Sequence, residues 1–177
     1  MFKEEREEQT FQWSQLGNVE EGRPNLGDTT SARVYRLMQY TLRDVMIRRF
    51  GVETASLIFY EAGHKAGQEF CRNVLDTELP FEGFIAQFQQ QLKELGIGIM
   101  RVEKVDLEEL SMILSVYEDL DCSGLPVSNE MICDYDEGFL AGVMETYTGK
   151  ALQAREVDCW AMGERVCRFE IGQTQEP

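Results

Sequence analysis

Residues 150–171 read KALQAREVDCWAMGERVCRFEI, and this stretch decides the fold class. Two runs with alternating side chains flank the short segment AMGE, a pattern that is typical of a β-hairpin. In the second run Cys167, Phe169 and Ile171 share one face, because successive side chains of a strand point to opposite faces. Two strands joined by so short a turn must be antiparallel. The sequence therefore predicts an antiparallel hairpin in this part of the chain.

Upstream of this hairpin the chain shows two more strand patterns and four helix patterns. The strand patterns are short and rich in aliphatic residues, and an acidic turn separates them. The helix patterns repeat apolar residues every three or four positions. Strands are expected over 97–105 and 111–118, and helices over 30–50, 54–75, 81–96 and 130–149. The predicted class is α+β: an antiparallel sheet of about four strands packed with about four helices, in the order ααα-ββ-α-ββ.

The helix expected over 30–50 has an apolar stripe and an arginine-rich face. Ser31 lies among residues that offer N-cap oxygens, and Gly51 marks the expected end. The stripe consists of Val34, Leu37, Met38, Thr41, Leu42, Val45 and Met46. The opposite face carries Arg33, Arg36, Arg43, Arg48 and Arg49. We expect these arginines to pair with carboxylates of the same chain or of a second subunit, and a basic docking face is the alternative.

Two of the expected helices contain glycines one turn apart. Gly63 and Gly67 form one pair, and Gly138 and Gly142 form the other. A glycine inside a helix costs up to ~1 kcal/mol relative to alanine. Such pairs therefore predict the close approach of another backbone or of a ligand.

The bulk composition limits the class of protein. With 177 residues, of which 43% are hydrophobic, the chain can bury a core as a single domain over 1–177. Its formal net charge of -15 repels phosphate backbones and anionic lipid, so we expect no direct binding of nucleic acid or membrane. Residues 1–10 are charged and lack the apolar core of a signal peptide, which predicts a frayed lead. We expect a cytoplasmic protein.

Five cysteines are present, an odd number that argues against a disulfide framework. Four potential ligands follow the spacing C-x22-E-x2-C-x7-C, and they are Cys133, Glu156, Cys159 and Cys167. Thiolates and a carboxylate are ligands that Zn²⁺ accepts in a tetrahedral site. The predicted hairpin would bring the last three together, and Cys133 would come from the start of the preceding helix. A site closed by four protein ligands is usually structural.

The spacing alone leaves other interpretations open. Buried free cysteines often pack as small apolar groups. Cys122, in the loop segment DLDCSGLP, is a spare thiol that would replace Cys133 as a ligand or belong to a ligand pocket. A catalytic cysteine needs a base, and nothing in the sequence places His64, the single histidine, beside any thiol. The sequence also lacks nucleotide-binding, nucleophile-elbow and zinc-protease motifs. We assign no catalytic residue.

The C-terminal third resembles the 4-vinyl reductase (4VR) domain family. The segments that carry the resemblance are CDYDEGFLAG and REVDCWAMGERVCRF, with the upstream GRPNLG and YEAGHKAG. The matching residues are Cys133, Gly138, Phe139, Gly142, Gly149, Glu156, Cys159, Gly163, Cys167 and Phe169. The resemblance covers most of the chain, and the last ~45 residues are its specific part. It includes the zinc-binding part expected over 130–171.

The resemblance implies an α+β ligand-binding module, usually dimeric, with a zinc site near an enclosed apolar pocket. Family members include sensory domains of activators that respond to aromatic compounds and a protein linked to bacteriochlorophyll vinyl-group reduction. Aromatic-sensing members bind zinc through one Glu and three Cys, which implies Cys133, Glu156, Cys159 and Cys167 here. The chain has no histidine after His64, so a phenol-type ligand is not expected. Haem-sensing relatives need an axial histidine, for which His64 is the sole candidate, and haem is not expected either.

The leading hypothesis is a sensor or binding module for a small hydrophobic or aromatic molecule, with structural zinc bracing the pocket. The ligand is expected between the sheet and the helices, walled by Tyr60, Phe84, Phe88 and Tyr117. The alternative is an enzyme or accessory protein in tetrapyrrole vinyl-group reduction. Such a reductase would need an external electron donor, because no nucleotide- or flavin-binding motif is present. A third interpretation is a scaffold that forms a homodimer through the arginine-lined helix.

Overall fold

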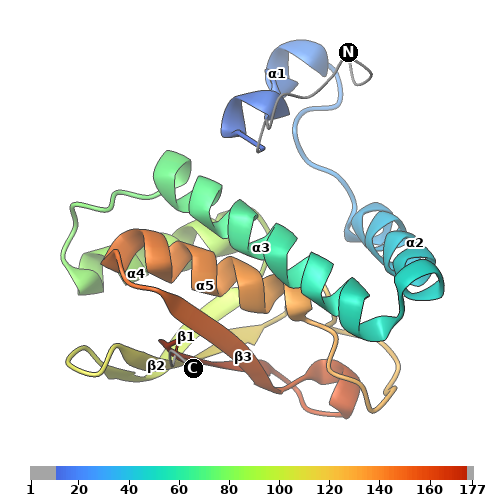
Figure 1. The fold of residues 1–177 in the computed structure, drawn as a ribbon. Helices are drawn as coiled ribbons and strands as arrows, with labels where there is room; N and C mark the ends of the chain where they lie inside the picture. Colours follow the sequence, from blue (N-terminus) through green and yellow to red (C-terminus); the bar gives the residue numbers. More distant parts are fainter. Residues whose placement is uncertain (1–10, 175–177) are drawn as a thin grey trace.

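A four-stranded antiparallel sheet forms the base of the fold in the computed structural model, which describes residues 11–174 (Figure 1). The strands are β1 (Ile99–Asp106), β2 (Ser111–Tyr117), β3 (Leu152–Asp158) and β4 (Cys167–Gln173). Their order across the sheet is β1-β2-β4-β3, so the C-terminal hairpin joins the first hairpin through the β2–β4 pair. The predicted α+β class and element order are confirmed. The lead predicted over 1–10 lies outside the described residues.

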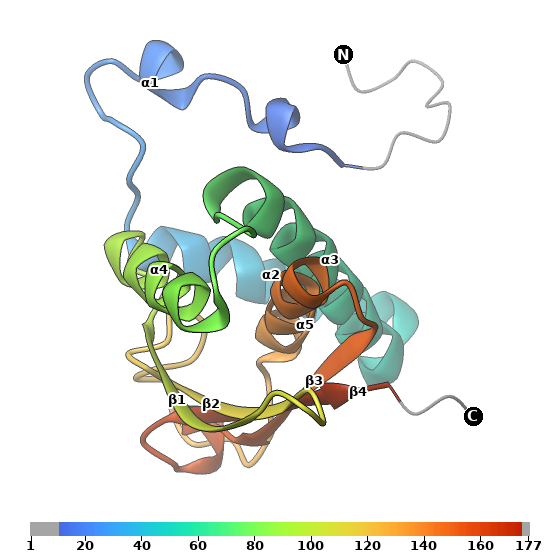
Figure 2. The ribbon, with the colours of Figure 1, turned by 90° about the vertical axis from the view of Figure 1, so that its left-hand side faces the viewer.

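The long helices lie on one face of this sheet (Figure 2). They are α2 (Ala32–Phe50), α3 (Val52–Val74), α4 (Phe81–Glu94) and α5 (Asp134–Thr148). Helix α4 packs against β1 and α5 packs against β3, while α3 packs on α5. Within residues 11–174, no helix combines the length and apolar character that a bilayer span requires.

The C-terminal hairpin has the predicted alternation. Cys167, Phe169 and Ile171 are buried in β4, and Val116 of β2 is the register partner of Cys167. A short 3₁₀ turn, η2 (Trp160–Met162), connects β3 to β4 and ends at Gly163. Gly163 has φ 101°, a left-handed conformation that residues with a side chain rarely adopt. The turn therefore depends on this glycine to direct β4 back along β3.

Helices α3 and α5 cross where the two predicted glycine pairs face each other. A Cβ atom added at Gly63 or Gly67 would overlap the backbone of α5, and one at Gly138 or Gly142 would overlap the backbone of α3. The overlapped atoms include the carbonyl oxygen of Tyr135. The approach predicted from the sequence is thus confirmed as backbone against backbone. Because these four glycines have no side chains, the backbones of the two helices can touch directly.

Residues 11–31 form an N-terminal arm that runs beside the helices before α2 begins (Figure 2). Within this arm the described residues form two short helical turns, η1 (Trp13–Leu16) and α1 (Val19–Gly22). The backbone N–H of Trp13 donates to the Glu69 carboxylate at 2.9 Å, and its ring meets Phe70 edge-on. These contacts attach the arm to α3.

Helix α2 faces the protein with its polar side. Ser31 caps the helix by accepting from the N–H of Arg33, and the helix ends at Gly51, as expected. Gln39 is its one buried residue, whereas Leu37 is 66% exposed. Arg43 forms the expected ion pair within the chain, with Asp134 at 2.6 Å, but Arg36 binds backbone carbonyls instead of carboxylates. The apolar stripe is left on the outside.

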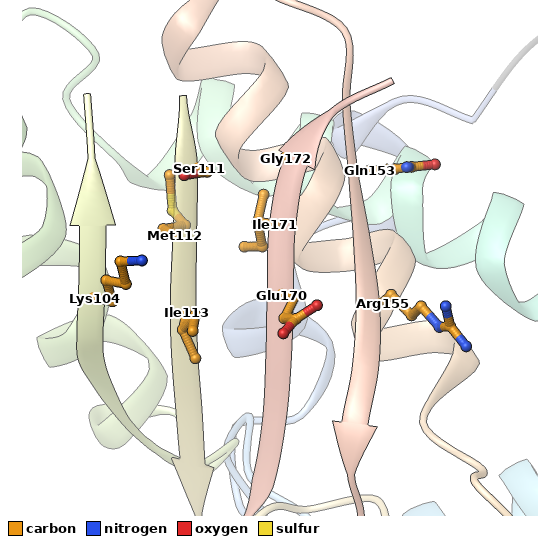
Figure 3. A pocket seen from close by; sticks show the side chains of 9 residues that line it. All are labelled: Lys104, Ser111, Met112, Ile113, Gln153, Arg155, Glu170, Ile171 and Gly172. Carbon is orange, nitrogen blue, oxygen red and sulfur yellow. The ribbon is translucent and has the colours of Figure 1, made fainter. Parts of the chain in front are cut away.

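The opposite face of the sheet carries polar side chains. Figure 3 shows Lys104, Ile113, Glu170 and Arg155 side by side on the four strands. They line an open depression of about 410 Å³ that includes none of the cysteines. Glu170 and Arg155 are oppositely charged register partners on β4 and β3, which suits a solvated surface, and we assign no function to this depression.

Candidate metal centre

Four thiols meet at one end of the sheet. The Sγ atoms of Cys122, Cys133, Cys159 and Cys167 all lie within 4.8 Å of one another, and the four residues are buried. The Cys122–Cys167 distance is 3.0 Å, and Cys133 lies 3.8 Å from Cys159 and 3.9 Å from Cys167. The fifth cysteine, Cys71, is buried in α3 and is not a member of this group. We call the four residues the cysteine cluster.

Each thiol of the cysteine cluster lies at or near the boundary of an element. Cys122 is in the loop after β2, and Cys133 is the N-cap residue of α5. Cys159 directly follows β3, and Cys167 is the first residue of β4. The hairpin turn at η2 brings the last two together, as the sequence predicted. The cluster therefore ties the end of the hairpin to the start of α5 and to the β2–α5 loop.

Glu156, the predicted carboxylate ligand, lies against this cluster. It points inward from β3, is 1% exposed, and accepts from the N–H of Cys133 at 3.3 Å through Oε2. Its other oxygen, Oε1, is buried and has no hydrogen-bond partner among the described residues. Burial, together with negative charge at Cys159, raises the pKa of Glu156 to about 9. A cation beside this carboxyl would favour its ionised form.

Two further acids surround the cysteine cluster. Asp119 accepts from the N–H groups of Asp121 and Cys122 at 2.8 and 3.0 Å, and burial beside Asp121 raises its pKa to about 6. The Oδ2 atom of Asp136 is buried without a partner in the described structure, and burial and the charge of Asp119 raise its pKa. Asp119, Cys133 and Asp136 form a second group with ligand atoms within 4.8 Å. The environment is strongly acidic, and a cation bound here would offset that charge.

The thiols themselves influence one another. Hydrogen bonds from Cys122, Cys133 and Cys167 lower the pKa of Cys159, so this sulfur holds negative charge most easily. The neighbouring Cys122 raises the pKa of Cys133 instead. Thiolates are the form that binds metal. The cluster thus offers four sulfur atoms, of which Cys159 loses its proton most easily, and a bound cation would deprotonate the others.

The donor set fits a tetrahedral metal ion. Four thiolates suffice for a closed site, and closed sites with sulfur ligands are typical of structural zinc. Three of the four residues predicted from the sequence, Cys133, Cys159 and Cys167, belong to the cluster, and Cys122 is the fourth thiol. Glu156 is placed beside the cluster, where its unpartnered oxygen makes it a fifth potential donor among the described residues.

The four residues predicted to wall a ligand pocket are spread over the core and its edges. Phe84 and Phe88 are fully buried in the core, where Phe84 stacks on Tyr147 with ring centroids 3.9 Å apart. Tyr60 is half-buried beside His64. Tyr117 lies under the guanidinium of Arg101. Phe84 and Phe88 belong to the hydrophobic core that residues of the helices and of the sheet form together.

A separate apolar cavity lies between the N-terminal arm and the helices. Its volume is about 450 Å³, and its walls include Trp13, Leu16, Ala66, Phe70, Tyr135 and Phe139. Lys65 and Glu69 are the charged residues of its lining. We call this space the arm cavity. Its size and apolar character with a few polar groups are those of small-molecule sites.

The fold and the cysteine cluster define an α+β domain with a thiol-rich candidate metal centre at the end of its sheet. Residues 112–173 match the model of the 4-vinyl reductase domain, and this stretch includes all four residues of the cluster. Over these residues the chain is similar to the 4-vinyl reductase domain, so the resemblance predicted from the sequence is confirmed.

Relatives with known sequence or structure agree with this assignment. An uncharacterised protein of Methanocaldococcus jannaschii is 28% identical over 147 residues, which cover 82% of this chain and 80% of the relative. The phenol-responsive sensory domain of the transcription activator PoxR, solved with phenol, superposes with a TM-score of 0.68 at 16% identity, covering 83% of this chain and 76% of that chain. A vinyl-4-reductase family protein from the same archaeon has a TM-score of 0.58 at 16% identity, with 88% of each chain covered. The two structures show a shared fold.

Proposed function

We propose that this protein is a small-molecule sensor or binding module built around a structural zinc ion. The observation that carries the proposal is the convergence of four buried thiols from four separate segments. Cys133, Cys159 and Cys167 would each bind the ion, and Cys122 would complete the tetrahedron. Glu156 is the competing fourth donor. Zinc would supply no reaction here, because a closed site has no position for a substrate.

The ligand we propose is a small hydrophobic or aromatic molecule. The likeness to a domain solved with phenol supports this class of ligand, although the fold is all that the two proteins are shown to share. Phe84 and Phe88, two of the pocket walls predicted from the sequence, are buried in the core and are not among the residues that line the arm cavity. We place the ligand in the arm cavity, where Trp13 and Phe139 offer aromatic faces and Lys65 offers a polar anchor.

Metal analysis and native mass spectrometry of the purified protein test the zinc centre. We expect one zinc ion per chain, and loss of that ion when Cys159 is changed to Ser. The proposal would be contradicted by a folded parent protein that contains no metal and that has the same stability as its Cys159→Ser variant. An absorption spectrum with tetrapyrrole bands would instead favour a role in vinyl-group reduction.

Titration with naphthalene, an aromatic probe without a hydroxyl group, followed through Trp13 fluorescence in a Trp160→Phe background, tests the arm cavity. We expect saturable quenching in the parent protein and weaker binding after Phe139→Ala, which removes one wall of the cavity. Phe81→Ala is the matched control, since Phe81 packs on Tyr147 and is not among the residues that line the cavity. Equal effects of the two substitutions would place the probe elsewhere.

A further inference from the structure

The arm cavity continues into a second apolar space between α2 and α3. This space has a volume of about 200 Å³, and its walls include Met38 and Leu42 of α2 and Ile58 of α3. Ala62 and Tyr135 line both spaces. Ala62 is exposed and its side chain is a single methyl group, so α3 raises no barrier between the two spaces at this point. We call the second space the α2 groove.

One face of α3 forms the floor of both spaces. The lining residues of α3 follow helical spacing, and they include Ile58, Ala62, Lys65, Ala66 and Glu69. From Ile58 to Glu69 the helix advances by about 16 Å, because each residue adds roughly 1.5 Å. An extended carbon chain advances by roughly 1.2 Å per bond, as an extended polypeptide backbone does. The floor therefore matches the length of an unbranched chain of about 13 carbon atoms.

Charge is confined to one end of this joint space. The described residues that line the α2 groove carry no formal charge, and its polar members, Tyr35 and Gln39, both donate to the carboxylate of Asp121. Lys65 and Glu69 are the charged lining residues, and both belong to the arm cavity. A ligand that fills both spaces therefore needs an apolar chain in the α2 groove and a polar group at the arm end.

The arm end favours a neutral hydroxyl over a charged head group. Glu69 accepts from the N–H of Trp13 at 2.9 Å, and it pairs with Arg72 at 3.2 Å and with Lys65 at 3.6 Å. A carboxylate has about four acceptor positions, so Glu69 can accept from one more donor. A carboxylate head group would be repelled by Glu69, and an ammonium head group by Lys65. A hydroxyl can donate to Glu69 and accept from Lys65 at the same time.

We propose that the arm cavity and the α2 groove together bind one unbranched primary alcohol of about 12 to 14 carbon atoms. In this assignment the hydroxyl binds Lys65 and Glu69, and the chain follows α3 toward Ile58. The inference rests on the ligand site of the proposed function and narrows the class of its ligand. It does not depend on the metal centre.

Binding of 1-hexanol and 1-dodecanol, followed through Trp13 emission in the Trp160→Phe background, tests the length of the site. At roughly 1.2 Å per bond, 1-hexanol is short enough to occupy the arm cavity alone. Each further buried methylene tightens binding about fourfold, so we expect 1-dodecanol to bind at least about a hundredfold more tightly than 1-hexanol.

Ile58→Glu tests the α2 groove, because a carboxylate in its wall excludes a hydrocarbon chain. We expect this change to weaken the binding of 1-dodecanol at least about tenfold and to leave that of 1-hexanol unchanged. Ala62→Phe narrows the junction of the two spaces and should have the same effect. Leu57→Glu is the matched control, since Leu57 is 55% exposed, lies next to Ile58 and lines neither space. A 1-dodecanol affinity that is equal in the parent protein and in both groove variants would overturn the joint site.

Dodecanoate tests the head group, because it has the chain length of 1-dodecanol and a negative charge. We expect dodecanoate to bind at least about tenfold more weakly, since its carboxylate would lie beside Glu69. Binding of dodecanoate as tight as that of 1-dodecanol would overturn the assignment of a hydroxyl head group.

Naphthalene separates this inference from the proposed function. Saturable binding of naphthalene, with no gain in affinity from 1-hexanol to 1-dodecanol, would overturn the elongated site and leave an aromatic ligand standing. Saturable binding of 1-dodecanol without binding of naphthalene would support the elongated site and overturn an aromatic ligand. A protein that binds neither probe would overturn both.

Discussion

The thiol of Cys122 lies 3.0 Å from the thiol of Cys167, although the two residues are 45 positions apart in the chain. This proximity arises because β2 and β4 are neighbours in the sheet, with Val116 opposite Cys167. The loop that follows β2 therefore begins beside the first residue of β4. Cys122 thus belongs to the cluster because β2 and β4 are neighbours in the sheet.

Cobalt substitution should show four thiolate ligands. The charge-transfer absorbance of thiolate-bound Co²⁺ scales with the number of Co–S bonds, so Cys122→Ser is expected to remove about a quarter of it, given four ligands in a tetrahedral site. Glu156→Gln should leave the band unchanged. The opposite pattern, a band insensitive to Cys122→Ser with metal lost in Glu156→Gln, would assign the fourth position to Glu156.

Zinc removal is expected to lower thermal stability. An ion that binds only the folded state contributes about 4 kcal/mol when present at a thousand times its dissociation constant. Differential scanning calorimetry with and without a chelator measures the change. The control is Cys71→Ser, because burial raises the pKa of this thiol to about 11 and it lies outside the cluster. This variant should keep the full zinc-dependent shift in melting temperature, and loss of the shift would contradict the assignment of ligands.

Gly67→Ala should destabilise the protein by about 1–3 kcal/mol, the usual cost of overpacking. The added methyl group would overlap the carbonyl of Phe139 on α5, and backbone atoms cannot move aside as a side chain can. Gly83→Ala is the matched control, because its Cβ would meet only the side chain of Leu79, at 3.6 Å or more. This control should be neutral or stabilising by up to about 1 kcal/mol. Urea unfolding of both variants measures the difference, and equal effects would contradict the backbone contact.

The N-terminal arm is expected to detach in acid. The hydrogen bond from the Trp13 N–H lowers the pKa of Glu69, and Lys65 and Arg72 add to this effect. A carboxyl whose pKa is lower in the folded state stabilises the fold above its unfolded pKa, and that contribution disappears as the pH falls through the folded value. Emission from Trp13, measured with Trp160→Phe in the background, should therefore shift to longer wavelength below the ordinary carboxyl range of about pH 4.

Glu69→Gln is the control for this acid transition. The amide can still accept the hydrogen bond but does not titrate, so the shift in Trp13 emission should lose its pH dependence. A transition that persists unchanged in Glu69→Gln would assign the effect to another carboxyl.

Local sequence pattern was sufficient for the elements and for most of the cluster. The period of apolar residues marked the four long helices and the strands to within a few positions. The short hairpin turn required Cys159 and Cys167 to approach each other. The glycine pairs correctly indicated a close backbone contact. The elements, the hairpin and the glycine pairs are each visible as a local pattern, which is why the sequence alone revealed them.

Features that depend on tertiary order could not be predicted in the same way. The periodicity of α2 identifies an apolar stripe but not the direction it faces, because Arg36 and Arg43 can be buried once carbonyls and Asp134 receive their hydrogen bonds. Periodicity likewise cannot tell whether Phe84 and Phe88 pack in the core or line a pocket. The membership of Cys122 required the β2–β4 pairing, which no short-range signal specifies.

The contact between α3 and α5 is made by main-chain atoms, and this has a consequence for how the sequence can vary. Rotamer changes and substitutions of neighbouring side chains cannot alter a distance that carbonyl groups and glycine Cα atoms determine. We therefore expect the distance between α3, which contacts the N-terminal arm, and the sheet beneath α5 to stay constant among relatives whose other core residues differ.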